Sequence, residues 1–401
     1  MFSQIARQPI FNQRKSVYAY ELLFRQSMGR TLGEIDGDQA TSSLLSSAFL
    51  MEEITQISGG KPCFVNFTEN LLLQEIAPSF PKEQIVIEIL EDVTPSPEVI
   101  AACRSLSEQG YTLALDDFVY RSDLTPLIEV ADIIKVDYRL SSPEEIVRML
   151  ERLAPFNLDF LAEKVETYEE FEQAAELGFR YFQGYFFAKP ESLQIKELTS
   201  NKANLLNLLA EISRPQISTK KLEQIIATDV ALTYKLLRYL NSVAFSLVKK
   251  IDTVFQAIVY LGEQEIRRFI TLVIVSELAS DKPTELMRLS MVRARFCQRL
   301  AEAATAGHDP DEVFLLGLFS LIDAMLDTPM EQVMNKLPLA GPVVEALTSR
   351  QGALAPYLET AIAYEQADPD SCLLLLEPLG VPPETLYPTY LEAISFANIL
   401  G

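Results

Sequence analysis

The segment TLALDDF, residues 112–118, joins a strand-like run to two consecutive acids. Similar short runs occur along the same part of the chain: CFVNF at 63–67, IVIEIL at 85–90, ADIIKVD at 131–137, DFLAEKV at 159–165 and YFQGYFF at 181–187. Between them lie polar segments with helical periodicity. Two of these end at Gly110 and Gly178, and glycine is the residue type expected just past a helix C-terminus. This alternation predicts parallel βα units from about residue 60 to 190.

The chain changes character near residue 195. From about Leu193 the strand pattern stops, and periodic apolar segments separated by Ser, Thr, Asp, Gly and Pro predict an all-helical bundle. The length of 401 residues, 48% of them hydrophobic, suits two or three folded domains. We therefore expect an α/β domain over residues 1–195 and an all-α domain over residues 196–401.

The composition argues against several functional classes. Asp and Glu number 56 against 34 Lys and Arg, and the formal charge of −22 opposes binding to nucleic acid or anionic lipid. The single histidine, His308, cannot build a multi-histidine metal site, and its Gly-His-Asp-Pro context predicts an exposed turn before a helix. The N-terminus lacks a signal-peptide core, and no apolar stretch approaches the roughly 20 residues that cross a membrane. With four widely spaced cysteines, the sequence predicts a soluble, cytoplasmic protein without membrane insertion.

Polar residues interrupt or end the predicted strands where a core strand would continue with Val or Ile. They are Asn66, Glu88, Asp116, Asp117, Lys135, Glu163 and Gln183. In a barrel of parallel strands such residues converge at the C-terminal mouth, where these barrels keep their active sites. A single buried acid is more often an ion-pair or helix-cap partner, but a set at successive strand ends favours a polar site.

The residue types at these positions indicate the chemistry. Carboxylate and amide oxygens are hard ligands suited to Mg²⁺, Mn²⁺ or Ca²⁺. The adjacent pair Asp116 and Asp117 suits two neighbouring cations, an arrangement used in phosphoester hydrolysis. Lys135 would orient the attacking water or neutralise a phosphate oxygen.

These segments resemble the bacterial EAL domain, a modified TIM (β/α)₈ barrel that hydrolyses cyclic di-GMP to linear pGpG with two Mg²⁺ or Mn²⁺ ions. The matching motifs are Gln8-Pro9-Ile10, Glu21-Leu22-Leu23-Phe24-Arg25 (E-A-L-L-R in the family), Asn66 (V-N-x-S), Glu88-Ile89-Leu90-Glu91 (E-x-T-E), Asp116-Asp117-Phe118 (D-D-F), Lys135-Val136-Asp137 (K-I-D), Ala162-Glu163-Lys164-Val165-Glu166 (A-E-G-V-E), Gln183-Gly184-Tyr185 (Q-G-Y) and Lys189-Pro190. Their order and spacing cover nearly all of residues 1–190.

The resemblance implies a role for each matching position. The metal ligands would be Glu21, Asn66, Glu88, Asp116 and Asp117, completed by Glu163 and Gln183. Lys135 and Glu163 would position and deprotonate the water. The substrate residues would be Gln8, Arg25, Asp137 and Pro190, with Asp137 holding either Lys135 or the substrate, and Glu91 would brace the loop after Asp117.

Two departures from the family pattern affect the site. The active enzymes usually continue G-T-G-Y-S-S after D-D-F, whereas this chain reads Val119-Tyr120-Arg121-Ser122-Asp123. Lys164 stands where A-E-G-V-E has glycine, the residue that best tolerates positive φ. We expect the loop after Asp117 to take another shape.

The second half is similar to the HDOD domain, a helical relative of the HD metal-dependent phosphohydrolases. The segment 314–323, which would carry their His-Asp pair, has no histidine. The resemblance therefore implies an unidentified protein partner rather than catalysis. We expect Arg267 and Arg268 to pair with nearby glutamates on a solvated helix face, and Tyr18 and Tyr20 to serve packing.

Three functions compete on this evidence. The first is a divalent-metal phosphodiesterase acting on cyclic di-GMP, and the second is an inactive barrel that serves as a cyclic di-GMP receptor or scaffold. The third is another Mg²⁺-dependent barrel enzyme, against which the glutamate of E-L-L-F-R argues. A homodimer is a further expectation, because EAL domains often pair around the D-D-F loop.

Overall fold

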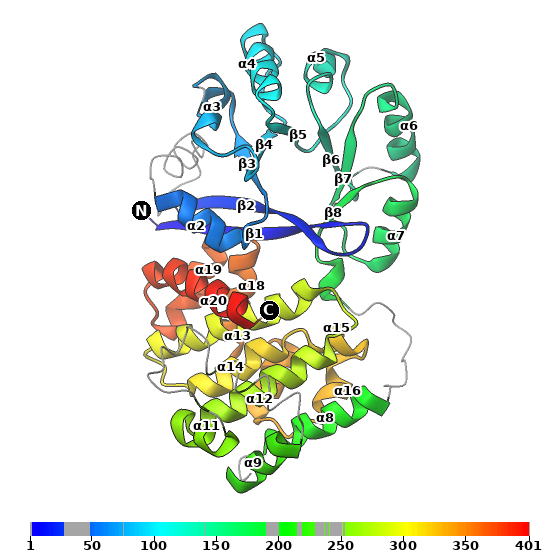
Figure 1. Cartoon of the computed structure of the whole chain (residues 1–401). Helices are drawn as coiled ribbons and strands as arrows, with labels where there is room; N and C mark the ends of the chain where they lie inside the picture. Colours follow the sequence, from blue (N-terminus) through cyan, green and yellow to red (C-terminus); the bar gives the residue numbers. More distant parts are fainter. Residues whose placement is uncertain are drawn as a thin grey trace.

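The N-terminal half of the computed structural model is a closed eight-stranded barrel with the strands in sequence order (Figure 1). The structure describes residues 2–27, 49–74, 76–140, 142–189, 200–214, 219–228 and 253–400, with Leu236, Leu240 and Ile251. The strands are β1 (Phe2–Asn12), β2 (Val17–Ser27), β3 (Cys63–Phe67), β4 (Ile85–Ile89), β5 (Thr112–Leu115), β6 (Ile133–Asp137), β7 (Asp159–Glu163) and β8 (Tyr181–Gln183). The predicted barrel is confirmed. The predicted domain boundary at 195/196 lies outside the described residues, as does Pro190.

The barrel departs from a regular (β/α)₈ barrel at its first strand. β1 pairs in antiparallel fashion with both β2 and β8, whereas every other neighbouring pair is parallel. The long β1–β2 hairpin places both strands side by side along the edge of the barrel that faces the helical half (Figure 1). Strand β1 has no counterpart among the runs that the sequence singled out.

Helices cover the outside of the barrel between the parallel strands. They are α2 (Phe49–Ser58), α3 (Glu69–Leu73), α4 (Pro97–Glu108), α5 (Thr125–Ile128), α6 (Pro143–Leu153) and α7 (Tyr168–Glu176). Several begin at the caps that the sequence provides: Ser96, Ser142 and Thr167 each accept a backbone N–H of the first turn. Strands β4 and β6 are buried along their whole length, which explains their nearly continuous apolar sequence.

The second half contains helices only among the residues described after Gln183, apart from short 3₁₀ turns. They are α8 (Ser200–Ile212), α9 (Thr219–Thr228), α11 (Val254–Leu261), α12 (Glu263–Leu278), α13 (Thr284–Ala303), α14 (Pro310–Phe319), α15 (Ile322–Leu326), α16 (Met330–Met334), α17 (Gly341–Ser349), α18 (Ala355–Glu365), α19 (Pro369–Leu376) and α20 (Leu386–Leu400). Helix α13 packs against α14, α18 and α20, and both α18 and α20 contact β1. The helical half therefore rests on the β1–β2 hairpin (Figure 1).

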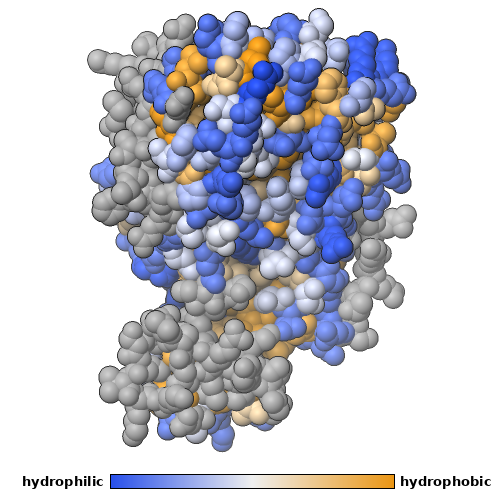
Figure 2. All heavy atoms as spheres, turned by 45° about the horizontal axis from the view of Figure 1, so that its top comes forward, coloured by the Kyte–Doolittle hydropathy of each residue, from blue (hydrophilic) through white to orange (hydrophobic). Residues whose placement is uncertain are grey.

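The surface over the barrel helices mixes hydrophilic and hydrophobic residues, with the hydrophilic ones predominating (Figure 2). Within the described part of the chain, none of the helices combines the length and the apolar character needed to span a membrane. His308 precedes α14, as predicted, but it is half-buried, so the predicted exposure is wrong. Its Nδ1 lies 3.1 Å from the hydroxyl of Tyr357, and the two rings meet edge to face.

Candidate active site

The inside of the barrel is built in two layers, an apolar one and a polar one above it. The apolar layer has one residue from each strand: Ile10, Ala19, Phe64, Val86, Ala114, Ile133, Leu161 and Tyr181. Residues two apart in a strand share a face. In β2 to β8 the next inward-facing position toward the mouth therefore lies two residues after each of these, and in β1, which runs the other way, it lies two residues before. Those positions are Gln8, Glu21, Asn66, Glu88, Asp116, Lys135, Glu163 and Gln183. The structure thus brings eight of the predicted site residues together at the barrel mouth.

Lys135 lies at the centre of this polar layer. Its Nζ donates to Glu88 Oε1, lies 2.8 Å from Asp116 Oδ1 and 2.8 Å from Glu163 Oε1, and is 3.5 Å from Glu21 Oε2. The lysine and Glu88 are almost fully buried. One ammonium therefore faces four carboxyl groups, which with all groups ionised leaves a formal net charge of −3.

Burial and charge crowding shift the pKa values in this cluster. Burial alone would lower the pKa of Lys135, but the surrounding carboxylates raise it well above its ordinary value, so the ammonium stays charged. Burial raises the pKa of Glu88 well above the usual carboxyl range despite the opposing effect of Lys135. Burial also raises the pKa of Glu163 to about 7, with Asp116 and Glu21 adding to the increase. Without another cation, the site reduces its excess negative charge by binding protons.

Five oxygen atoms of the predicted ligands are buried without a hydrogen-bond partner. They are Asn66 Oδ1, Glu88 Oε2, Asp117 Oδ1, Glu163 Oε2 and Gln183 Oε1. A buried acceptor without a donor is costly, and several such oxygens at one place are what a bound hard cation would satisfy. Among the described residues no three His, Cys, Asp or Glu side chains already enclose a metal-sized position. The ammonium of Lys135 lies where the carboxylates converge and takes one oxygen each from Glu88 and Glu163. The oxygens that it leaves without a hydrogen bond are hard donors of the type that suits a divalent cation.

The amide of Gln183 connects β8 to the first two strands. Its Nε2 donates to Glu21 Oε2 at 2.6 Å and to Gln8 Oε1 at 2.9 Å. Gln8 and Glu21 are themselves cross-strand partners in the hairpin. Arg25 pairs with Gln4 in the same hairpin through its backbone, but its side chain lies outside the described residues.

Lys164 forms a feature that the sequence did not predict. It follows β7 with φ of +57°, and its Nζ donates to Asp137 Oδ2 and lies 3.8 Å from Asp117 Oδ1. Asp117 also has a positive φ, +38°. Asp137 thus holds Lys164, where the sequence predicted Lys135 or the substrate. Burial opposes ionisation of Asp137, yet its pKa stays below the ordinary value because of hydrogen bonds, first of all from Lys164. The sequence feature that could have indicated this contact is Lys164 itself, which stands where the family motif has glycine.

The loop after Asp117 is anchored at its start and open beyond it. Phe118 is buried and its N–H donates to the carbonyl oxygen of Lys135 at 3.0 Å, whereas Val119 is exposed. The loop continues into a 3₁₀ turn at Ser122–Leu124, and the expected difference in shape from the family's loop stays a prediction. Glu91, predicted to brace this loop, is exposed and makes no recorded hydrogen bond to it within the described part of the chain.

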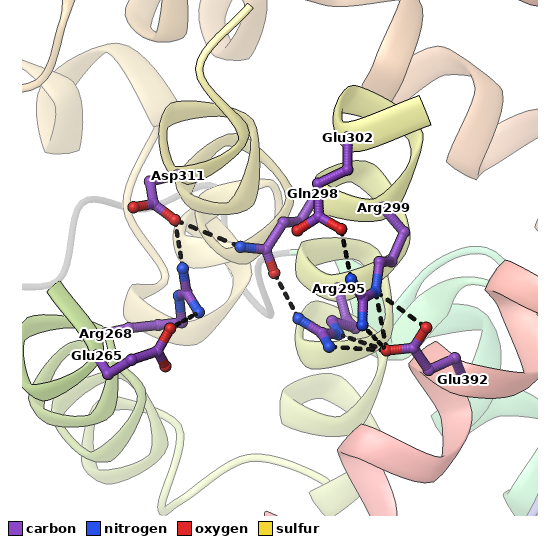
Figure 3. A network of polar contacts seen from close by, with 8 residues as sticks. All are labelled: Glu265, Arg268, Arg295, Gln298, Arg299, Glu302, Asp311 and Glu392. Atoms are coloured by element: carbon purple, nitrogen blue, oxygen red, sulfur yellow. Dashed lines mark hydrogen bonds and ion pairs between the residues drawn. The ribbon is translucent and has the colours of Figure 1, made fainter. Parts of the chain in front are cut away.

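The helical half carries a separate polar network, drawn in Figure 3. The predicted pairing is confirmed, since Arg267 Nη2 lies 2.6 Å from Glu263 and Arg268 Nη1 lies 2.6 Å from Glu265. The prediction of a solvated face is wrong for the two arginines, because both are half-buried. Arg268 also pairs with Asp311 on α14. Both arginines therefore have an acidic partner within α12, and Arg268 also connects α12 to α14.

The chain resembles known proteins over its whole length. A family model described as the EAL domain matches residues 4–190, and one described as the HDOD domain matches residues 198–335. The uncharacterized protein YuxH of Bacillus subtilis is 38% identical over 404 residues, covering 99% of this chain and 98% of YuxH. Cyclic di-GMP phosphodiesterase CdgJ of Vibrio cholerae is 38% identical over 367 residues, covering 91% of this chain and 85% of CdgJ. A solved calcium and cyclic di-GMP complex of BlrP1 from Klebsiella pneumoniae shows 22% identity over 47% of this chain and 55% of BlrP1, with a TM-score of 0.38.

Proposed function

Since the chain belongs to the family of bacterial proteins in which an EAL domain precedes an HDOD domain, we propose that it is a phosphodiesterase that opens cyclic di-GMP to linear pGpG. The observation that carries the proposal is the set of five buried oxygens without a hydrogen-bond partner near the Lys135 cluster. A polar layer built only to stabilise the barrel would satisfy its own acceptors. The 38% identity with CdgJ over most of both chains supports the choice of substrate.

We assign the roles as follows. Glu21, Asn66, Glu88, Asp116, Asp117, Glu163 and Gln183 would hold Mg²⁺ or Mn²⁺, which when bound lowers the pKa of a coordinated water and stabilises the leaving oxygen. Lys135 keeps Asp116 and Glu163 oriented and supplies a fixed positive charge beside the phosphate. Glu163 accepts the proton of the attacking water. Gln8, Arg25, Asp137 and Pro190 remain the proposed substrate contacts, and Glu91 the proposed support of the loop.

The proposal is tested with purified full-length protein, cyclic di-GMP and Mn²⁺ or Mg²⁺, by following linear product chromatographically. We expect turnover by the wild type, loss of product for Glu21→Ala, and a fall in kcat of about 10²–10⁴-fold for Glu163→Gln. Asp159→Asn is the matched control. Asp159 begins the same strand as Glu163 at the opposite end of the barrel and pairs with Arg180, so its loss leaves the mouth intact.

The same assay separates the enzyme from the receptor. A wild type that forms no product, yet is stabilised by cyclic di-GMP in a thermal melt, would overturn the enzyme proposal and leave the barrel as a receptor. The altered loop after Asp117 is the feature that favours this second function. Equal turnover by wild type and Glu163→Gln would overturn the assignment of the proton acceptor.

The wider setting of the activity is also proposed. We place the domain boundary at 195/196, between the two family-model matches. We further propose a cytoplasmic location, an unidentified protein partner for the helical half and a homodimer formed by the barrel. Nucleic acid is not a proposed ligand, because the formal charge of −22 opposes it.

A further inference from the structure

The β1–β2 hairpin presents different residues to the two halves of the molecule. Gln8 and Glu21 face the barrel mouth and both accept hydrogen bonds from Gln183. Their sequence neighbours Arg7 and Tyr20 point the opposite way, because successive strand residues alternate between faces. That opposite face is the one on which α18 and α20 rest. Each strand thus carries a site residue and an interface residue at adjacent positions.

Four residues form a polar joint between the halves: Arg7, Tyr20, Glu285 and Arg288. The Tyr20 hydroxyl donates to Glu285 Oε2 at 2.8 Å and accepts from Arg288 Nη1 at 3.1 Å. Arg7 Nη2 lies 3.9 Å from Glu285 Oε1, and its guanidinium stacks 4.4 Å from the centre of the Tyr20 ring. Tyr20 is buried, in agreement with its assignment to packing, and its hydroxyl adds polar contacts that the sequence did not predict.

The polar joint is buried and closely packed. Arg7 and Glu285 are 7% and 6% exposed, and Tyr20 is fully buried. Removing one partner of a buried ion pair is strongly destabilising, because the other charge is left uncompensated. A cavity of about 30 Å³ lies beside the joint and is lined in part by Arg7, Gln8 and Glu285. A shift of α13 would therefore either break these buried contacts or displace the hairpin with it.

Helix α13 is itself fixed along its length. Glu285 and Arg288 lie in its first turns, and Arg293 in its middle donates to the buried Glu365 on α18. Farther along, Arg295 and Arg299 both donate to Glu392 on α20 (Figure 3). The helix that holds the hairpin is thus anchored to the core of the helical half.

We propose that Arg7 and Tyr20 are positioning residues through which α13 holds Gln8 and Glu21 at the barrel mouth. The helical half then helps to hold the ligands of the site in place, and its position sets the affinity of the barrel mouth for the divalent cation. This inference rests on the proposed function for the identity of the cation. The connection between α13 and the hairpin rests on the polar joint alone.

The test compares Tyr20→Phe and Glu285→Gln in the full chain by hydrogen exchange and by calorimetric titration with Mn²⁺. We expect faster amide exchange over β1 and β2, with β4–β6 unchanged. Mn²⁺ affinity is expected to fall about 10-fold, the size of effect typical when support behind a ligand is lost. Tyr20→Phe keeps the ring and removes only the hydroxyl, so it remains informative if Glu285→Gln fails to fold.

Glu302→Gln is the matched control. It is the same substitution in a glutamate near the other end of α13, whose ion pair with Arg299 lies within that helix. We expect it to leave both readouts unchanged. Unchanged exchange of β1 and β2 in Tyr20→Phe and Glu285→Gln would overturn the proposal, as would faster exchange with unaltered Mn²⁺ affinity. A wild type that binds no Mn²⁺ would instead contradict the proposed function, while the exchange data would still decide whether α13 holds the hairpin.

Discussion

At the scale of single residues, the barrel mouth is dominated by a conflict between burial and charge. The ammonium of Lys135 is shared by four largely buried acids, and acids are rarely buried unless they are paired. They are Glu21, Glu88, Asp116 and Glu163. Lys135 relieves part of the repulsion. Protons or metal ions must relieve the rest, and these two alternatives make the site sensitive to pH.

The pH dependence of stability follows from Glu163. Burial raises its pKa from an ordinary 4.5 to about 7, so the folded, metal-free protein binds more protons than the unfolded chain between these values. The contribution of Glu163 to the free energy of unfolding is therefore greatest below about pH 4.5, and it is lost as the pH rises through about 7. One pKa unit corresponds to about 1.4 kcal/mol. Urea unfolding of EDTA-treated protein at pH 5 and pH 8 measures the fall.

The Glu163→Gln variant isolates this contribution, because an amide cannot titrate. We expect its stability to vary less between pH 5 and pH 8 than that of the wild type. Identical pH profiles for the two proteins would show that Glu163 titrates as an ordinary carboxyl group.

Lys164 gives a second prediction at this scale. Its ammonium lies 3.8 Å from Asp117 Oδ1 and competes with a cation for that oxygen. Both side chains are substantially exposed, and such pairs contribute about 0–1 kcal/mol. We therefore expect Lys164→Gly to bind Mn²⁺ up to about fivefold more tightly in a calorimetric titration. Lys164→Arg, which keeps the charge, should behave like the wild type. Weaker binding by Lys164→Gly would mean that the lysine supports the site.

At the scale of elements, the site depends on how closely the strand ends approach each other. Gly184 directly follows β8 with φ of +146°, and a Cβ there would overlap the backbone carbonyl of Val165. The N–H of Val165 donates to the carbonyl oxygen of Gln183 at 2.9 Å. Glycine thus allows the segment after β7 to pack against the end of β8, where Gln183 bridges to Glu21.

Substitution at Gly184 tests this packing. We expect Gly184→Ala to lower stability by about 1–3 kcal/mol through overpacking and to weaken Mn²⁺ binding by shifting Gln183. Gly178→Ala is the control, because Gly178 also has a positive φ, +98°, but open space around it. Its free energy of unfolding should fall only by the cost of backbone strain at alanine, and its Mn²⁺ affinity should stay unchanged. Equal effects of the two variants on Mn²⁺ binding would contradict the packing argument.

The strands and the residues at their ends were predictable from the sequence because local rules govern both. A buried strand needs a run of apolar residues, and period-two alternation decides which residue shares a face with Glu88 or Glu163. The contact between Lys164 and Asp137 was not predictable, because it depends on a left-handed backbone at a non-glycine residue. Strand β1 was missed because polar residues such as Gln4, Arg7 and Gln8 break its apolar pattern.

At the scale of the whole molecule, the division into a barrel and a helical half agrees with the two family-model matches. The contact between the halves was beyond sequence reasoning, because no pattern along one chain shows that Arg7 meets Glu285 some 280 residues later. Both residues are charged, and charged residues are expected at the surface. Only the three-dimensional arrangement shows that they are buried against each other.

On β1 and β2, site residues and interface residues are direct sequence neighbours, which limits the insertions, deletions and domain exchanges that the barrel tolerates. Inserting or deleting one residue in either strand would exchange the two faces and send Arg7 or Tyr20 into the mouth. Joining the barrel to a different domain would leave Arg7 and Tyr20 without their partners Glu285 and Arg288. Transferring the barrel to another protein would therefore require new residues at positions 7 and 20 as well.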